Sequence, residues 1–153
     1  QNIVIGGAAG SIPPMVGWAA VTGGLDLPAL YLFTIVFFWT PPHFWALALL
    51  IQKDYKNAGV PMLPVVVGEE RTTQNIFMYS LALVALTLLF AATDAVGLIY
   101  VASAAALGVV FLVMAWNLKR EQTTRKAKHL YLYSLLYLAL LFSVMLADSV
   151  FRF

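Results

Sequence analysis

A short polar run between two apolar segments, residues 52 to 64, holds the residues best suited to chemistry. It contains one acid, Asp54, flanked by Lys53 and Lys56. A carboxylate suits Mg²⁺, which usually takes one or two protein carboxylates and fills its other positions with water and substrate phosphate oxygens. Lysine binds phosphate as a point charge. The run therefore predicts a site for Mg²⁺ and a phosphate group, with Asp54 as the metal ligand; a solvated connector with lysines on the cytoplasmic side of a membrane is the alternative.

A second candidate group is His43, which follows Pro41 and Pro42 inside an apolar stretch rich in aromatic residues. An ionisable side chain at membrane depth is a functional hypothesis by default. The imidazole could ligate haem or another metal, or contact a substrate. Alternatively, it could be neutral and bonded to a backbone carbonyl that the prolines leave free. If one helix continued from His43 to Asp54, both would lie on one face, roughly 16 Å apart.

Glycine and proline are concentrated in residues 6 to 17 of the first apolar segment. Gly6 and Gly10 form a small-xxx-small ridge that allows close helix contact. Pro13 and Pro14 remove two backbone donors and bend the helix. Because a broken helix at membrane depth is tolerated where it lines a protein-enclosed cavity, we expect this segment to border one. Packing alone would also account for the glycines.

The elements that must position these residues are membrane-spanning helices. Of the 153 residues, 62% are hydrophobic and 10% are charged, whereas soluble domains have roughly 45–50% and 25%. About 20 apolar residues span the hydrocarbon core as a helix, so the composition excludes a soluble globule and predicts an all-α, polytopic membrane helix bundle. The chain has no cysteine, which excludes disulfides and thiolate metal sites. We expect a single membrane domain over residues 1–153, with spans at about 3–22, 29–51, 74–92, 96–117 and 129–147.

The positions of the basic residues support five spans. If the spans alternate, the linkers 53–71 and 119–128 share one face of the membrane. Eight of the nine Lys and Arg residues lie in these two linkers, and only Arg152 lies elsewhere. Both linkers are therefore predicted to be cytoplasmic. Basic residues beside apolar spans favour membrane lipids as a partner and argue against nucleic acid.

Three motifs together resemble a known family. Residues 7 to 18 read GAAGSIPPMVGW, residues 39 to 45 read WTPPHFW, and residues 53 to 64 read KDYKNAGVPMLP. In order and spacing they resemble the haem O synthase (protohaem IX farnesyltransferase) group of the UbiA-type intramembrane prenyltransferases. The resemblance covers essentially the whole chain. Its specificity lies in residues 1 to 64, because the last three apolar segments would fit many membrane proteins.

The resemblance implies helices five to nine of a nine-helix fold in the cell inner (plasma) membrane. The family transfers farnesyl from farnesyl diphosphate to a vinyl group of haem B, releasing diphosphate and giving haem O. Haem B is then a substrate, Mg²⁺ a cofactor, and haem A synthase or terminal oxidases are assembly partners. The chain lacks an initiator methionine and the family's first aspartate-rich motif. We therefore expect a C-terminal fragment of a longer protein that is inactive alone.

The family's functional residues carry over to this chain where its motifs match. Asp54 and Lys53 are the catalytic candidates, and Asp54 is also the metal ligand. The aromatic residues Trp39, Phe44 and Trp45 could contact the prenyl chain or shield a cation, and packing or contact with lipid is the alternative. The substrate-binding candidates are His43, Lys56, Asn57, Tyr55 and Trp39.

Two other functions fit parts of the sequence. One is another UbiA-type prenyltransferase whose acceptor is an aromatic quinone precursor. The other is half of a membrane transporter, since transporters also use broken helices around a midplane site. The spans contain no acidic residue, which argues against a proton-coupled or ion-coupled path.

Overall fold

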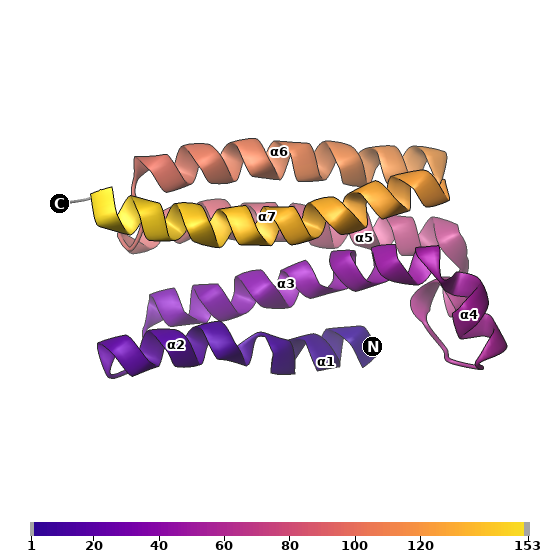
Figure 1. Cartoon of the computed structure of the whole chain (residues 1–153), viewed down its shortest axis with the longest axis horizontal. Helices are drawn as coiled ribbons and strands as arrows, with labels where there is room; N and C mark the ends of the chain where they lie inside the picture. Colours follow the sequence, from indigo (N-terminus) through magenta and orange to yellow (C-terminus); the bar gives the residue numbers. More distant parts are fainter. Residues whose placement is uncertain (1, 152–153) are drawn as a thin grey trace.

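The computed structural model describes residues 2–151, and this part of the chain is helical with short connections (Figure 1). The predicted position of Arg152 lies outside the described residues. The elements, in chain order, are α1 (Asn2–Gly10), α2 (Ile12–Thr22), α3 (Leu27–Leu50), α4 (Gln52–Asn57), α5 (Leu63–Leu89), the 3₁₀ helix η1 (Phe90–Thr93), α6 (Leu98–Glu121) and α7 (Thr124–Phe151).

Within the described residues, five helical segments are long and apolar enough to cross a membrane. This confirms the all-α fold class with five spans. The segments are Ile3–Thr22, Leu27–Leu50, Leu63–Thr93, Leu98–Glu121 and Thr124–Val150. The helices run beyond several of the expected spans because polar residues continue the helical backbone past the apolar core.

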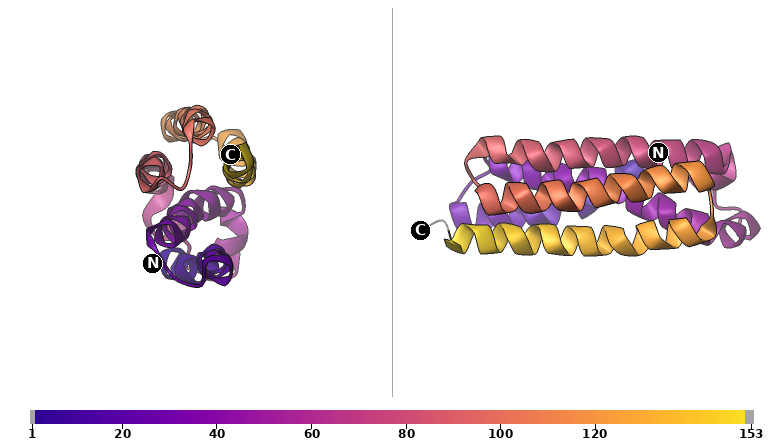
Figure 2. Two further views of the ribbon diagram at one scale, coloured as in Figure 1. Left: turned by 90° about the vertical axis from the view of Figure 1, so that its left-hand side faces the viewer. Right: turned by 90° about the horizontal axis from the view of Figure 1, so that it is seen from above.

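The long helices lie side by side and alternate in direction (Figures 1 and 2). α5 packs on α6, α6 on α7, and α3 on both α5 and α7. The pair α1–α2 packs on α3 and lies outside this bundle when it is seen end-on (Figure 2). α2 has no buried residue, and apolar side chains such as Val21 are exposed. This outer surface suits contact with lipid.

The first span breaks at Ser11, between α1 and α2, as predicted. Pro13 and Pro14 follow within the first turn of α2 and cannot donate backbone hydrogen bonds. The Ser11 hydroxyl donates to the carbonyl oxygen of Gly7 at 2.7 Å, and this carbonyl also accepts from the Ser11 backbone N–H. The break divides the span into two short helices that lie along part of α3 (Figure 1).

The close contact between α1 and α3 is made by Gly7, not by the ridge of Gly6 and Gly10 that the sequence predicted. A Cβ atom on Gly7 would lie 3.0 Å from Cγ2 of Thr40, so a larger residue would require the Thr40 side chain to shift by a few tenths of an ångström. A Cβ atom on Gly6 or Gly10 would meet nothing within 4 Å. Within residues 2–151, the predicted ridge of Gly6 and Gly10 therefore packs against no other helix.

The helix that carries His43 does not continue to Asp54. α3 runs through Pro41 and Pro42 but ends at Leu50, where Ile51 leaves helical geometry (φ −112°, ψ 29°). α4 then starts as a separate short helix that turns away from α3 (Figure 1). The prediction that His43 and Asp54 share one helix face is therefore wrong.

Much of the predicted linker 53–71 is helical. α5 begins at Leu63, with Pro64 in its first turn, where a missing N–H costs nothing. Gly68 interrupts α5 with φ 83°, which glycine adopts without strain. The main helix restarts at Glu69, and an acidic residue is stabilising near the N-terminus of a helix. Thr72 stabilises this restart by donating its hydroxyl proton to the Gly68 carbonyl at 2.7 Å.

A buried acidic residue stabilises the opposite end of the bundle. Asp148 of α7 is 2% exposed and accepts hydrogen bonds from the backbone N–H groups of Gly97 and Tyr100 at the start of α6. The Tyr100 hydroxyl in turn donates to the carbonyl oxygen of Thr87 in α5. The carboxylate therefore caps α6 from a neighbouring helix and links the last three helices.

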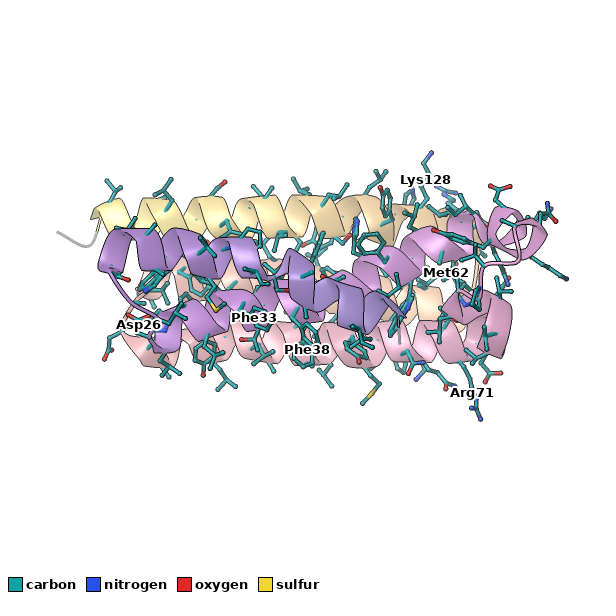
Figure 3. All side chains as sticks on the ribbon, turned by 90° about the horizontal axis from the view of Figure 1, so that it is seen from below. Asp26, Phe33, Phe38, Met62, Arg71 and Lys128 are labelled. Carbon is teal, nitrogen blue, oxygen red and sulfur yellow. The ribbon has the colours of Figure 1, made fainter. Side chains whose placement is uncertain are left out.

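The predicted separation of charge is visible along the bundle. α4, the start of α5, the end of α6 and the start of α7 gather at one end (Figure 1). Arg71 and Lys128 lie at this end, and Asp26 lies at the other (Figure 3). We call the end that carries α4 the basic end.

Candidate functional site

A polar pocket of about 380 Å³ opens at the basic end. It contains the predicted pair Lys53 and Asp54, which extend from α4. Glu69, which follows the Gly68 kink of α5, and Thr124 at the start of α7 line the same pocket. All four side chains are exposed, so a ligand can reach them. The remaining lining residues are Leu49, Leu50, Ile51 and Gln52.

The position of α4 is set by contacts with the chain that follows it. The Gln52 side-chain amide donates to the Pro64 carbonyl at 3.0 Å, tying α4 to the start of α5. The N–H of Val60 returns to the carbonyl of Tyr55 at 2.9 Å, with Gly59 at φ 67° making the turn. These bonds hold the backbone of Lys53 and Asp54 at the pocket.

The other predicted residues of the 52–64 run are not brought into this pocket. Lys56 and Asn57 are exposed on α4, and Tyr55 is half-buried. None of the three lines the pocket that contains Asp54. Their role in binding substrate stays a prediction.

The carboxylates of the polar pocket suit a magnesium ion that is shared with a phosphate ligand. No group of three or more His, Cys, Asp or Glu side chains that could hold a metal occurs within residues 2–151. The pocket supplies two carboxylates, Asp54 and Glu69. Mg²⁺ commonly takes one or two carboxylates and completes its octahedron with waters and phosphate oxygens. The donor set therefore fits Mg²⁺ bound together with a phosphorylated substrate.

His43 lies in a polar contact between α3 and α7. Its Nδ1 atom is 2.7 Å from the hydroxyl oxygen of Ser134. Its ring stacks between Trp39, at 4.4 Å between centroids, and Tyr131, at 4.8 Å. Phe44 meets the ring edge-on at 5.2 Å. The partner is thus a hydroxyl of another helix, not the backbone carbonyl that the alternative interpretation expected.

An apolar pocket of about 360 Å³ lies between α1 and α3 beside this histidine. Gly6, Gly7 and Gly10 form one wall, and Trp39 and Phe44 belong to the other. The first span therefore borders a cavity, as expected. The pocket is completed by Ile3, Val36 and Thr40.

Trp45 does not share this location. It is 6% exposed and packs edge-on against Tyr79 of α5 at 5.2 Å between ring centroids. Packing thus accounts for Trp45, whereas Trp39 and Phe44 are available to a ligand.

Sequence reasoning did not select Glu69 or Ser134 as site residues. The sequence around Gly68 and Glu69 gave no sign that Glu69 would line the pocket of Asp54. Ser134 lies 91 residues from His43 and is one of three serines in α7, so nothing in the sequence singled it out.

The long apolar helices and their two pockets define a polytopic helical membrane protein. The sequence model of the UbiA prenyltransferase family matches residues 1–145, and the chain belongs to this family. No solved structure matches the chain.

Similar curated proteins share one name. A "Protoheme IX farnesyltransferase" of Roseiflexus sp. (strain RS-1) is 58% identical over 98% of this chain and 28% of its own length. The protein of the same name from Gloeobacter violaceus is 54% identical over 100% of this chain and 50% of its own length. That of Burkholderia ambifaria is 51% identical over 97% of this chain and 49% of its own length. The chain thus spans between about a quarter and half of the length of these relatives.

Proposed function

We propose that the protein containing this chain transfers farnesyl from farnesyl diphosphate to a vinyl group of haem B, giving haem O and diphosphate. The observation that carries this proposal is the identity of 51–58% over nearly the whole chain with relatives named protoheme IX farnesyltransferase. The name favours haem over a quinone precursor as acceptor. It also favours a transferase over a transporter.

The polar pocket supports the role of a diphosphate site. Lys53 places a positive charge beside the two carboxylates Asp54 and Glu69. When bound by these carboxylates, Mg²⁺ would neutralise the charge that develops on the leaving diphosphate. Lys53 would contact a phosphate oxygen and hold the diphosphate at the basic end. Lys56, Asn57 and Tyr55 would then act at the mouth of the site, where α4 carries them.

The apolar pocket supports the role of a prenyl site. Gly6 and Gly10 carry no side chains and leave space along α1 for a greasy chain. Trp39 and Phe44 offer aromatic faces, which attract a developing carbocation. Exclusion of water by these walls would protect the cation from hydrolysis. His43, behind the aromatic wall, would contact the haem.

The rest of the protein would complete this site. Because the chain spans 28–50% of its relatives' lengths, we place the family's first aspartate-rich motif in the remainder and propose that this C-terminal part alone is inactive. The concentration of Lys and Arg supports a cytoplasmic location of the basic end, in a protein of the cell membrane. Haem A synthase or a terminal oxidase would then receive the product.

The test is Asp54→Asn in the full-length protein, reconstituted in lipid with haem B, farnesyl diphosphate and Mg²⁺. We expect loss of haem O, measured by chromatography and mass spectrometry, while membrane insertion is unchanged. The control is Glu121→Gln, which removes an exposed acid at the same end that pairs with Lys126 outside the pocket. A wild-type rate of haem prenylation by Asp54→Asn would remove this residue from the mechanism. Prenylation of hydroxybenzoate in place of haem would contradict the assignment of haem B as the acceptor.

A further inference from the structure

The hydrogen bonds around His43 define which of its ring nitrogens carries the proton. The Ser134 hydroxyl oxygen lies 2.7 Å from His43 Nδ1 and 2.6 Å from the backbone carbonyl oxygen of Tyr131. A serine hydroxyl has one proton to donate and can accept further bonds. Because the carbonyl oxygen can only accept, the Ser134 proton goes to Tyr131. The hydroxyl oxygen must then accept from His43 Nδ1–H.

This assignment leaves the other nitrogen free. A neutral imidazole carries one N–H, so protonation at Nδ1 leaves a lone pair on Nε2. No hydrogen bond joins Nε2 to any residue of the described range 2–151. Within that range, the fully buried side-chain atom that lacks a partner is Trp18 Nε1, so Nε2 keeps a small accessible area although His43 as a whole is only 7% exposed. The Nε2 lone pair is therefore not engaged by the described part of the chain.

The ring is also held in place by its neighbours. Trp39 and Tyr131 stack on its two sides, with interplanar angles of 18° and 27°. The Trp39 indole N–H donates to the backbone carbonyl of Ser134 at 2.8 Å, so α3 and α7 meet through two hydrogen bonds at one residue. A ring fixed in both tautomer and orientation is characteristic of histidines that ligate metals, which donate their second N–H to a neighbouring oxygen.

We propose that Ser134 is a positioning residue that keeps His43 in the Nδ1–H tautomer, so that Nε2 donates its lone pair to the iron of the haem substrate. The inference rests on the proposed function for the identity of the ligand, but the tautomer depends on the hydrogen bonds alone. Trp39 keeps its bond to the Ser134 backbone in Ser134→Ala, so this substitution removes the hydroxyl and leaves the helix contact.

The tautomer is tested without substrate, in the full-length protein labelled with ¹⁵N-histidine and held in lipid nanodiscs. The signals that disappear in His43→Gln belong to His43. We expect a protonated Nδ1 and an unprotonated Nε2 in the wild type, and a shift towards Nε2–H in Ser134→Ala. The matched control is Ser143→Ala, which removes an exposed hydroxyl from the same helix. An Nε2–H tautomer in the wild type, or an unchanged tautomer in Ser134→Ala, would overturn the proposal.

The ligand is tested by titrating the same proteins with haem B and following the absorbance of iron–imidazole coordination. We expect His43→Gln to lose this spectrum and Ser134→Ala to bind haem roughly 10–100-fold more weakly, as when the outer partner of a metal-bound histidine is removed. Equal haem affinity in Ser134→Ala and the wild type would overturn the positioning role. A wild-type protein that makes no haem O would overturn the proposed function and leave the tautomer result standing.

Discussion

Gly10 offers a direct test of the apolar pocket between α1 and α3. A Cβ atom there meets nothing within 4 Å, so a side chain can start from this position without a clash with the described residues. Because Gly10 lines the pocket, the side chain of Gly10→Leu would extend into the space that we assign to the farnesyl chain. The substitution therefore competes with substrate, while the contact of Gly7 with Thr40 stays intact.

The size of the effect follows from the apolar contact that the leucine displaces. Each buried methylene contributes about 0.8 kcal/mol. A leucine side chain has four carbon atoms and would displace two to four prenyl carbons from the 360 Å³ pocket. The expected loss is about 1.6–3.2 kcal/mol, which corresponds to a KM for farnesyl diphosphate raised about 15-fold to 200-fold. The shorter geranyl diphosphate should lose less.

The assay is steady-state prenylation of haem B by the full-length protein, with farnesyl and geranyl diphosphate compared in each variant. Gly17→Leu is the matched control, because its Cβ also meets nothing within 4 Å but the residue lies in α2, away from the pocket. If Gly10→Leu and Gly17→Leu share the wild-type KM for farnesyl diphosphate, the pocket does not hold the prenyl chain and the reasoning fails.

Two further substitutions test the polar pocket and the capping acid. Glu69→Gln should raise the Mg²⁺ concentration for half-maximal haem prenylation by roughly tenfold, since one of two carboxylates is lost. Glu70→Gln, which changes the neighbouring acid outside the pocket, should leave this concentration unchanged. Equal effects of the two substitutions would exclude a specific role for Glu69. Asp148→Ala should lower the free energy of unfolding by about 2–3 kcal/mol, because two N–H groups of α6 lose their acceptor. Thermal unfolding in detergent measures this, with the exposed neighbour in Ser149→Ala as control, and an unchanged midpoint would show that α6 needs no cap.

The helices and the first break were predictable because their causes are local. Charged residues are costly in hydrocarbon, so uncharged stretches of about 20 residues have few alternatives to a spanning helix. Pro13 and Pro14 lack the N–H that a continuous helix needs at those positions, whatever surrounds them. The position of the basic end was predictable for a similar reason, because it follows from the order of the spans and from the concentration of Lys and Arg in two linkers.

The ends of the helices and the relation between α3 and α4 were not predictable. Ile51 and Gly68 leave helical geometry at positions where the sequence shows no proline. The turn at Ile51 is followed by a contact between segments, the bond from the Gln52 side chain to the Pro64 carbonyl, whereas Gly68 adopts a positive φ that glycine allows without strain. An extrapolated helix from His43 to Asp54 ignored this contact, and it placed the two groups on one face in error.

The amino-acid sequence alone thus identifies the apolar spans, the basic end, and Lys53, Asp54 and His43 as chemically capable groups, because residue type and short-range spacing suffice for these. The partners of those groups come from the packing of the bundle. Glu69 reaches the pocket of Asp54 through the kink at Gly68, and Ser134 reaches His43 because α7 packs against α3. Such pairs are distant in the chain, so no local pattern encodes them, and they form when apolar helix faces bury each other.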